Sequence, residues 1–212
     1  MSEAGRNKQR TIAARKTAQL RSAARRLAQG SGGVVLIGMT DATRLPDPLA
    51  ALDALPRGEA LIWRSYGERP NAATMQHVAR VARAKGCLLL LAGEPGPTRR
   101  LGVDGLHLPE RFLKRPYKES YGIVTAAAHS EAAVHEAARA GANAILISPV
   151  FPTASHPGAP ALGILKFAVL ARLARSLGMA PYALGGIATA DDVKRLTGTG
   201  AAGIAGIGFL QA

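Results

Sequence analysis

Hydroxyl and imidazole side chains gather in one loop that directly follows a short apolar run. Residues Ala144–Ile147 predict a buried strand, and Ser148, Thr153, Ser155 and His156 follow it on a proline-rich segment. Ligands of parallel α/β folds bind beyond the carboxyl ends of the strands. Hydroxyls and a basic side chain on a stiff loop at that edge suit an anionic ligand such as phosphate. The alternative is an ordinary connection between a strand and a helix.

Two glycine-rich turns near the end of the chain point to the same kind of ligand. One predicted strand ends in Gly185 and Gly186, and the sequence GIAGIG at 203–208 predicts a last strand followed by a turn at Ile207 and Gly208. Glycine lets backbone N–H groups approach an anion closely, and a helix N-terminus adds partial positive charge. Because barrels commonly hold phosphate in the loops after strands seven and eight, these turns predict a phosphate cradle.

The elements that must position these groups alternate along the chain. Short apolar runs predict strands, and alanine-rich stretches between most of them predict helices. The predicted strands are 34–39, 60–64, 87–91, 105–108, 122–125, 144–147, 182–184 and 203–205; the clearest helices are 72–85, 130–140, 165–177 and 190–197, and 93–102 predicts a loop. Eight such strands favour a closed (β/α)8 TIM barrel, an α/β fold, formed as a single domain by residues 31–212.

The net charge of +13 is concentrated at the N-terminus. Residues 1–30 contain eight Lys or Arg and one acid, Glu3, and their many alanines predict a basic helical extension. This helix could pack on the barrel, contact nucleic acid or another anionic surface, or serve as a targeting segment. We favour packing. Nucleic acid comes second, because aromatic side chains that stack on bases make up only 4% of the chain.

Composition argues against several other classes of protein. The single cysteine, Cys87, lies in an apolar run and is expected to be buried. No Cys/His cluster suggests a metal site, and no apolar run approaches the roughly 20 residues of a membrane span. We therefore expect a cytoplasmic protein with no membrane contact. Its expected partner is a small-molecule phosphate, and a homo-oligomer is an open alternative to a monomer.

Six motifs occur together in the second half of the chain: GVDGLHL at 102–108, AHS at 128–130, PVFPT at 149–153, PALG at 160–163, LGGI at 184–187 and the stretch 200–210. In order and spacing they resemble the thiamine phosphate synthase/TenI family of thiamine biosynthesis. The resemblance implies a (β/α)8 barrel. The synthases of this family are transferases that join hydroxymethylpyrimidine diphosphate to a thiazole phosphate carboxylate with Mg²⁺, whereas TenI relatives include tautomerases of the thiazole phosphate.

The resemblance also implies roles for individual residues. Thr153 and Ser155 match the loop that contacts pyrophosphate and the thiazole carboxylate, and His156 stands where that loop carries a lysine. Gly186, with Gly185 before it, and the Ile207-Gly208 turn match the part of the site that holds the thiazole phosphate. Ser130 matches a serine that contacts pyrophosphate, and Arg64 matches an arginine of the pyrimidine diphosphate site.

The metal-binding part of the family pattern is missing. Ala92 and Gly93 replace an Asn-Asp pair, and Pro109-Glu110-Arg111-Phe112 replaces a Gly-Gln-x-Asp motif. Further departures are Ile62, Tyr66 and Gly208, where the family has Gln, Lys and Ser. Magnesium needs oxygen ligands, so this chain is expected to need no cofactor, with Mg²⁺ required only if it is a synthase. Glu110 could supply a single carboxylate.

His129 is the candidate catalytic residue. It lies between a predicted strand and helix, and it matches the histidine proposed as the proton shuttle of thiazole tautomerases; a role in ordering the loop is the alternative. His107 alternates with leucines and is expected to face the barrel interior, and Asp41 is expected to be a turn residue. Three hypotheses follow: a tautomerase-like or inactive homologue, which we favour; an active synthase with a rearranged metal site; and a regulatory or nucleic-acid-associated module.

Overall fold

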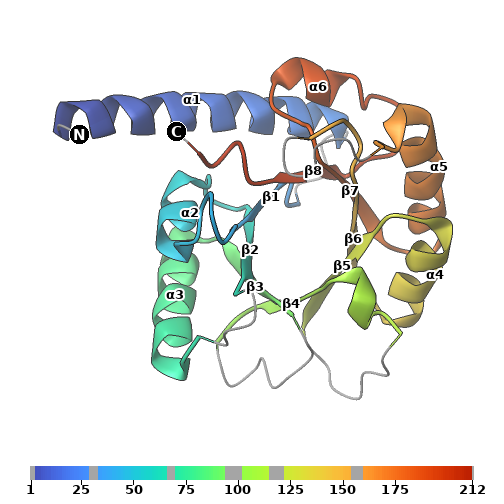
Figure 1. The fold of residues 1–212 in the computed structure, drawn as a ribbon, viewed down its shortest axis with the longest axis horizontal. Helices are drawn as coiled ribbons and strands as arrows, with labels where there is room; N and C mark the ends of the chain where they lie inside the picture. The colour runs from blue at the N-terminus through green and yellow to red at the C-terminus, as the bar shows by residue number, and fades with distance from the viewer. Residues whose placement is uncertain are drawn as a thin grey trace.

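Eight parallel strands close into a barrel in the order β1 to β8 (Figure 1). The structure is a computed structural model that describes residues 3–28, 33–65, 70–93, 102–114, 122–153 and 160–211. The strands are β1 (Leu36–Met39), β2 (Ala60–Arg64), β3 (Leu88–Ala92), β4 (Gly105–Leu108), β5 (Ile123–Ala128), β6 (Ala144–Ile147), β7 (Ala180–Leu184) and β8 (Gly203–Gly206). The barrel closes where β8 pairs with β1, with Gly206 beside Gly38. The predicted (β/α)8 fold is thus confirmed.

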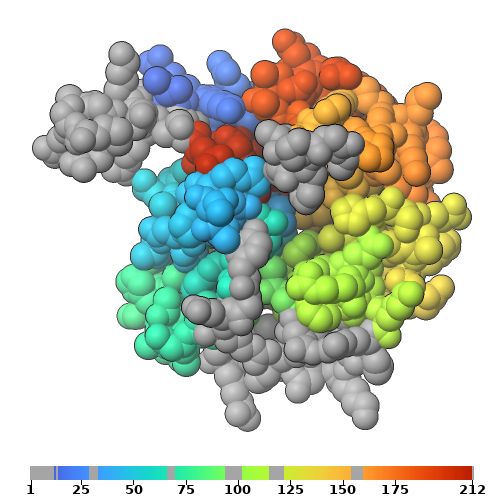
Figure 2. Space-filling view, in the orientation of Figure 1, coloured from blue at the N-terminus to red at the C-terminus, as the bar shows by residue number. Residues whose placement is uncertain are grey.

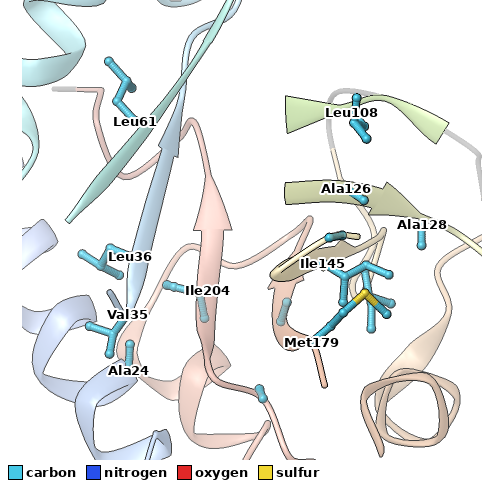
Figure 3. Close-up of a cluster of buried hydrophobic side chains, with 14 of the residues drawn as sticks. Ala24, Val35, Leu36, Leu61, Leu108, Ala126, Ala128, Ile145, Met179 and Ile204 are labelled. Atoms are coloured by element: carbon cyan, nitrogen blue, oxygen red, sulfur yellow. The ribbon is translucent and has the colours of Figure 1, made fainter. Parts of the chain in front are cut away.

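The alternation of side chains along the strands divides the core into two parts. One cluster fills the barrel interior and includes Ile62, Leu90 and Tyr182. The other lies between the barrel and its helices, and part of it is seen in Figure 3. Because both faces of every strand are covered, the strands are near-continuous apolar runs, which is why the sequence located all eight.

The helices cover the outside of the barrel. They are α2 (Pro48–Ala54), α3 (Ala72–Lys85), α4 (Glu131–Arg139), α5 (Gly163–Ser176) and α6 (Ala190–Lys194), with a 3-10 helix, η2 (Glu110–Phe112), after β4. Helix α2 was not predicted, because seven residues are too few to show a helical period. Its start carries a local signal, since Asp47 accepts a hydrogen bond from the Leu49 N–H and proline follows it. Of the loop predicted at 93–102, residues 94–101 lie outside the described part of the chain.

The first helix, α1 (Glu3–Leu27), fills the position on the barrel wall that a helix after β8 normally takes. It packs against α6, α2 and β8, and residues 207–211 after β8 contain no helix. Those C-terminal residues lie between α1 and α2 (Figure 2). The buried face of α1 includes Leu20, Ala23 and Ala24, and Ala24 lies beside Val35 and Leu36 (Figure 3).

Two polar contacts fix α1 at opposite ends of the barrel. At the amino end of β2, the Nε of Arg21 donates to the Glu59 carboxylate over 2.5 Å, and the same carboxylate accepts the N–H groups of Val35 and Leu36. At the carboxyl end of β8, the buried Thr17 hydroxyl donates to the Phe209 carbonyl over 2.7 Å. The helix therefore runs from the carboxyl end of the barrel towards its amino end. Among the described helices, none has the length and apolar character needed to cross a bilayer.

Candidate functional site

His129 lies between β5 and α4 at the carboxyl end of the barrel, where the sequence predicted it. Its Nδ1 is 2.7 Å from the backbone carbonyl oxygen of Ser148 and 3.3 Å from the Ser148 hydroxyl. A carbonyl oxygen only accepts, so Nδ1 carries the hydrogen and the lone pair of the neutral ring lies on Nε2. The side chain is 54% exposed, and Nε2 lies 3.9 Å from the Glu110 carboxylate. His129 is thus held at one nitrogen and basic at the other.

Two neighbours of His129 have structural partners. The Glu110 carboxylate accepts the backbone N–H of His129 over 3.0 Å, which ties η2 to the end of β5. The Ser130 hydroxyl oxygen accepts the N–H of Ala133 over 3.3 Å and caps α4. This cap occupies the Ser130 oxygen only, so the predicted contact of Ser130 with an anion remains a prediction.

The turn after β7 requires glycine at both of its positions. Gly185 and Gly186 have φ of 100° and 70°, in the left-handed region that other residues rarely adopt. A Cβ on Gly186 would lie 2.5 Å from the carbonyl oxygen of Pro152, and one on Gly185 would lie 2.9 Å from Pro149. The two loops are joined by a hydrogen bond from the Phe151 N–H to the Gly185 carbonyl. The PVFPT loop, which ends at Thr153, therefore lies directly against the β7 turn.

The turn after β8 lies beside the β7 turn and is open. Leu184 pairs with Ala205, so Gly186 and Ile207, each two residues further on, lie at the same level of the barrel. Gly208 is exposed, and a Cβ built on it would meet no atom within 4 Å. Within the described part of the chain, the backbone N–H groups of Gly186 and Gly208 have no hydrogen-bond acceptor. These two groups suit an anion at the β7–β8 end of the barrel.

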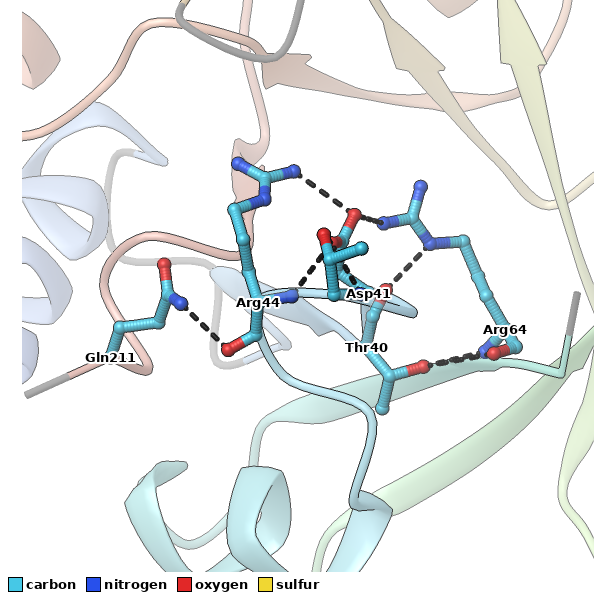
Figure 4. A network of polar contacts seen from close by, with 6 residues as sticks. Thr40, Asp41, Arg44, Arg64 and Gln211 are labelled. Atoms are coloured by element: carbon cyan, nitrogen blue, oxygen red, sulfur yellow. Dashed lines mark hydrogen bonds and ion pairs between the residues drawn. The ribbon is translucent and has the colours of Figure 1, made fainter.

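Arg64 extends from the end of β2 into a network with the turn after β1 (Figure 4). Its Nε donates to the Thr40 carbonyl over 2.6 Å, and its Nη2 lies 3.2 Å from the Asp41 carboxylate. Asp41 also accepts from the backbone N–H and the guanidinium of Arg44, as expected of a turn residue. Hydrogen bonding from the Arg44 side chain holds the pKa of the Asp41 carboxyl well below its usual range, against the opposing effect of its burial.

A neutral histidine lies two strands away from Arg64, on β4. His107 is buried, as predicted, and its Nδ1 is 2.9 Å from the Thr125 hydroxyl. Burial, and secondarily the positive charge of Arg64, lowers the pKa of His107 to about 3. His107 is therefore uncharged at neutral pH.

The described side chains do not fit the magnesium ion of the synthases. Ala92 and Gly93 end β3 without side-chain oxygens. Among the described carboxylates, Asp41 is bound by two arginines and Glu110 by the backbone of His129. No group of three or more His, Cys, Asp or Glu side chains among residues with described positions could hold a metal ion.

Several of the predicted site residues are thus brought to one end of the barrel, namely Arg64, His129, Ser130, Thr153, Gly185, Gly186, Ile207 and Gly208. Ser155, His156 and Tyr66 lie outside the described residues. Sequence reasoning counted Ser148 among the hydroxyls that suit an anion but did not predict that it orients His129. It assigned no role to Arg44, which binds Asp41. The sequence signal for the contact with His129 is the position of Ser148 directly after β6.

These features define a (β/α)8 barrel with paired glycine turns at its β7–β8 end and a histidine at the end of β5. Comparison with known families supports this class of protein. The model of the family described as "Thiamine monophosphate synthase" (TMP-TENI) matches residues 40–210. The chain belongs to this family, which confirms the resemblance stated from its motifs.

Individual relatives match a shorter part of the chain than the family model does. The chain is 37% identical over 113 residues to the "Putative thiamine-phosphate synthase 2" of Aquifex aeolicus, a match that covers 51% of this chain and 59% of that protein. It is 30% identical over 127 residues to a thiamine-phosphate synthase of Thermus thermophilus, covering 58% of this chain and 60% of that one. The aligned stretches thus span about three fifths of either relative.

A solved structure supports the fold. The thiamine phosphate pyrophosphorylase of Pyrococcus furiosus superimposes with a TM-score of 0.62 at 22% identity, over 82% of this chain and 85% of that one. The deoxyribose phosphate aldolase of Aeropyrum pernix also superimposes, with a TM-score of 0.58 at 16% identity over 94% of each chain. Because proteins with different names share this barrel, the fold alone assigns no reaction.

Proposed function

We propose that this chain binds a thiazole phosphate at the β7–β8 end of its barrel and transfers a proton on it through His129, without a metal ion. The observation that carries the proposal is the contact of His129 Nδ1 with the Ser148 carbonyl. Because this contact places the lone pair of the neutral ring on the exposed Nε2, the histidine is ready to act as a base. Membership of the family supports the class of ligand.

The proposed reaction is a tautomerisation and needs few groups. A carbon-bound proton of the ligand passes to Nε2 of His129, and the resulting imidazolium returns it to a second atom of the ligand. The Glu110 carboxylate, 3.9 Å from Nε2, would lie beside the charged ring during this transfer. The N–H groups of Gly186 and Gly208 would hold the phosphate, so that the reacting atoms meet Nε2 in a fixed orientation.

The two relatives are thiamine-phosphate synthases by name, which favours a second candidate, a magnesium-dependent synthase. In the family, carboxylates hold the metal that neutralises the departing pyrophosphate. Here Ala92 and Gly93 cannot replace them, and both Asp41 and Glu110 already have partners. We derive no step through magnesium for this chain. A homologue that binds the thiazole phosphate without turning it over is the third outcome to test.

The decisive experiment gives the purified protein a thiazole phosphate carboxylate and follows its tautomers by NMR, with and without EDTA. We expect interconversion above the buffer rate that EDTA leaves unchanged. A second reaction adds hydroxymethylpyrimidine diphosphate and Mg²⁺ and measures pyrophosphate. Magnesium-dependent pyrophosphate release at an enzymatic rate would overturn the proposal in favour of the synthase. Binding without interconversion would identify an inactive homologue.

A further inference from the structure

The middle of helix α1 lies beside the carboxyl end of β8. Thr17 is bound there to the Phe209 carbonyl, and the Nζ of the preceding residue, Lys16, lies 3.5 Å from the Gly208 carbonyl. The two contacts join residues 192 positions apart in the chain. A lysine of the N-terminal helix therefore reaches the β8 turn, where the phosphate cradle is proposed.

The position of α1 removes a usual source of positive charge from this end of the barrel. Barrel phosphate sites commonly combine the loops after strands seven and eight with the N-terminus of a helix. Here the N-terminus of α1 is at Glu3, thirteen residues or roughly 20 Å before Lys16, since a helix rises about 1.5 Å per residue. The N–H groups of α1 beside β8 are bonded within the helix, so its dipole offers nothing to an anion there.

The neighbouring helix α6 does not supply the charge either. Its capping residue, Thr189, and the preceding Ala188 both donate their backbone N–H groups to the Asp192 carboxylate. These amides are satisfied by an acidic side chain of the same helix. Arg195, which follows α6, lies over the ring of Phe151, 4.3 Å from its centroid. The described cation that contacts the β8 turn therefore comes from another element.

Lys16 has the geometry to supply it. A 3.5 Å contact with a neutral carbonyl is long and weak, so turning the ammonium towards an anion costs little. The space beside Gly208 is open. The adjacent Thr17 is buried and bonded, which fixes the helix against the turn and gives Lys16 a defined origin.

We propose that Lys16 of α1 is the cation of the phosphate site, pairing with a phosphate monoester that the Gly186 and Gly208 N–H groups bind. This inference rests on the proposed binding of a thiazole phosphate at the β7–β8 end. It gives the basic N-terminal helix a second role, as part of the ligand site as well as of the barrel wall.

The test compares Lys16→Gln with Arg15→Gln, which removes the same charge from the adjacent, exposed residue of α1. Binding of the thiazole phosphate, and of inorganic phosphate as a probe, is measured by calorimetry for each variant. We expect Lys16→Gln to weaken binding by about 10-fold or more, because a charge-assisted hydrogen bond is lost. Arg15→Gln should bind as the unmodified protein does, and Lys16→Arg should retain most of the affinity.

The outcomes separate the two proposals. If the unmodified protein binds neither ligand, the proposed function fails together with this inference. The unmodified protein could instead bind while Lys16→Gln binds equally well, or while both glutamine variants bind more weakly to the same degree. In either case Lys16 is not the cation of the site, and only this inference is overturned. Thermal melting of each variant checks that the fold is retained, as expected for the partly exposed Lys16.

Discussion

Arg21 of α1 donates its Nε–H to the Glu59 carboxylate over 2.5 Å, where Glu59 is 1% exposed at the floor of the barrel. The contact joins the first helix to the start of β2 and buries a charge that is compensated by Arg21 and two backbone N–H groups.

Arg21→Ala should therefore destabilise the protein by about 2 kcal/mol, since it removes the charged partner of the buried Glu59 carboxylate and leaves that carboxylate only its two backbone N–H donors. The free energy of unfolding in urea measures the effect. Arg25→Ala, on the exposed face of the same helix, should change it by less than about 0.5 kcal/mol. Equal losses for the two variants would contradict the anchoring role of Arg21.

His129→Asn should lower the rate of tautomer interconversion by about 100-fold or more, the usual contribution of a general acid–base group. Asparagine keeps a nitrogen donor for the Ser148 carbonyl but has no basic atom in place of Nε2. NMR rates and calorimetric binding are compared in one preparation. Weakened binding with an unchanged catalytic rate would instead assign His129 to ordering the loop.

Gly186→Ala and Gly208→Ala form a matched pair at the two turns of the cradle. A methyl group at 186 meets the Pro152 carbonyl at 2.5 Å, and the positive φ there costs a non-glycine residue about 1–2 kcal/mol. We expect Gly186→Ala to lose at least that much stability and Gly208→Ala to stay within about 0.5 kcal/mol of the unmodified protein. The free energy of unfolding in urea measures both effects. A Gly186→Ala variant as stable as the unmodified protein would show that the β7 turn does not require glycine at position 186.

The titration of His107 predicts how stability falls in acid. Its pKa is lowered to about 3 by burial and then by Arg64, from about 6.5 in the unfolded chain, so the unfolded state takes up a proton first. This contribution to stability is complete above pH 6.5 and is lost as the pH falls towards 3, by at most about 1.4 kcal/mol per pH unit. His107→Asn should flatten the dependence between about pH 6.5 and 4 in urea unfolding. An unchanged slope would assign the acid sensitivity to other groups.

The sequence was a good guide to the fold for a physical reason. Strands covered on both faces are apolar throughout and interrupted by turn residues, so their positions can be read locally. The ends of the strands are harder to predict. Strand β5 continues to Ala128, three residues past the predicted end, because alanine occurs in both strands and helices and so does not mark where a strand stops. Helix α6 ends at Lys194, three residues before the predicted end at Thr197.

The site was predictable only where a residue's place in the chain fixes its role. His129 could be located at the end of a strand, but its partner Ser148 is nineteen residues away and is brought to it by the pairing of β5 with β6. The contact of Lys16 with Gly208 depends on closure of the whole barrel. Such contacts follow from strand order, which local patterns do not contain.

The position of α1 has a consequence for the synthesis of this protein. The ribosome makes α1 before strands β1 to β8, yet the acceptor of the Thr17 hydroxyl is Phe209, which follows β8. The wall between α6 and β1 therefore stays open until β8 and Phe209 have been made, and α1 completes its docking only then. Since contacts over such long separations form slowly, a nascent chain stalled before β8 should expose the apolar face of a helix that the finished protein buries.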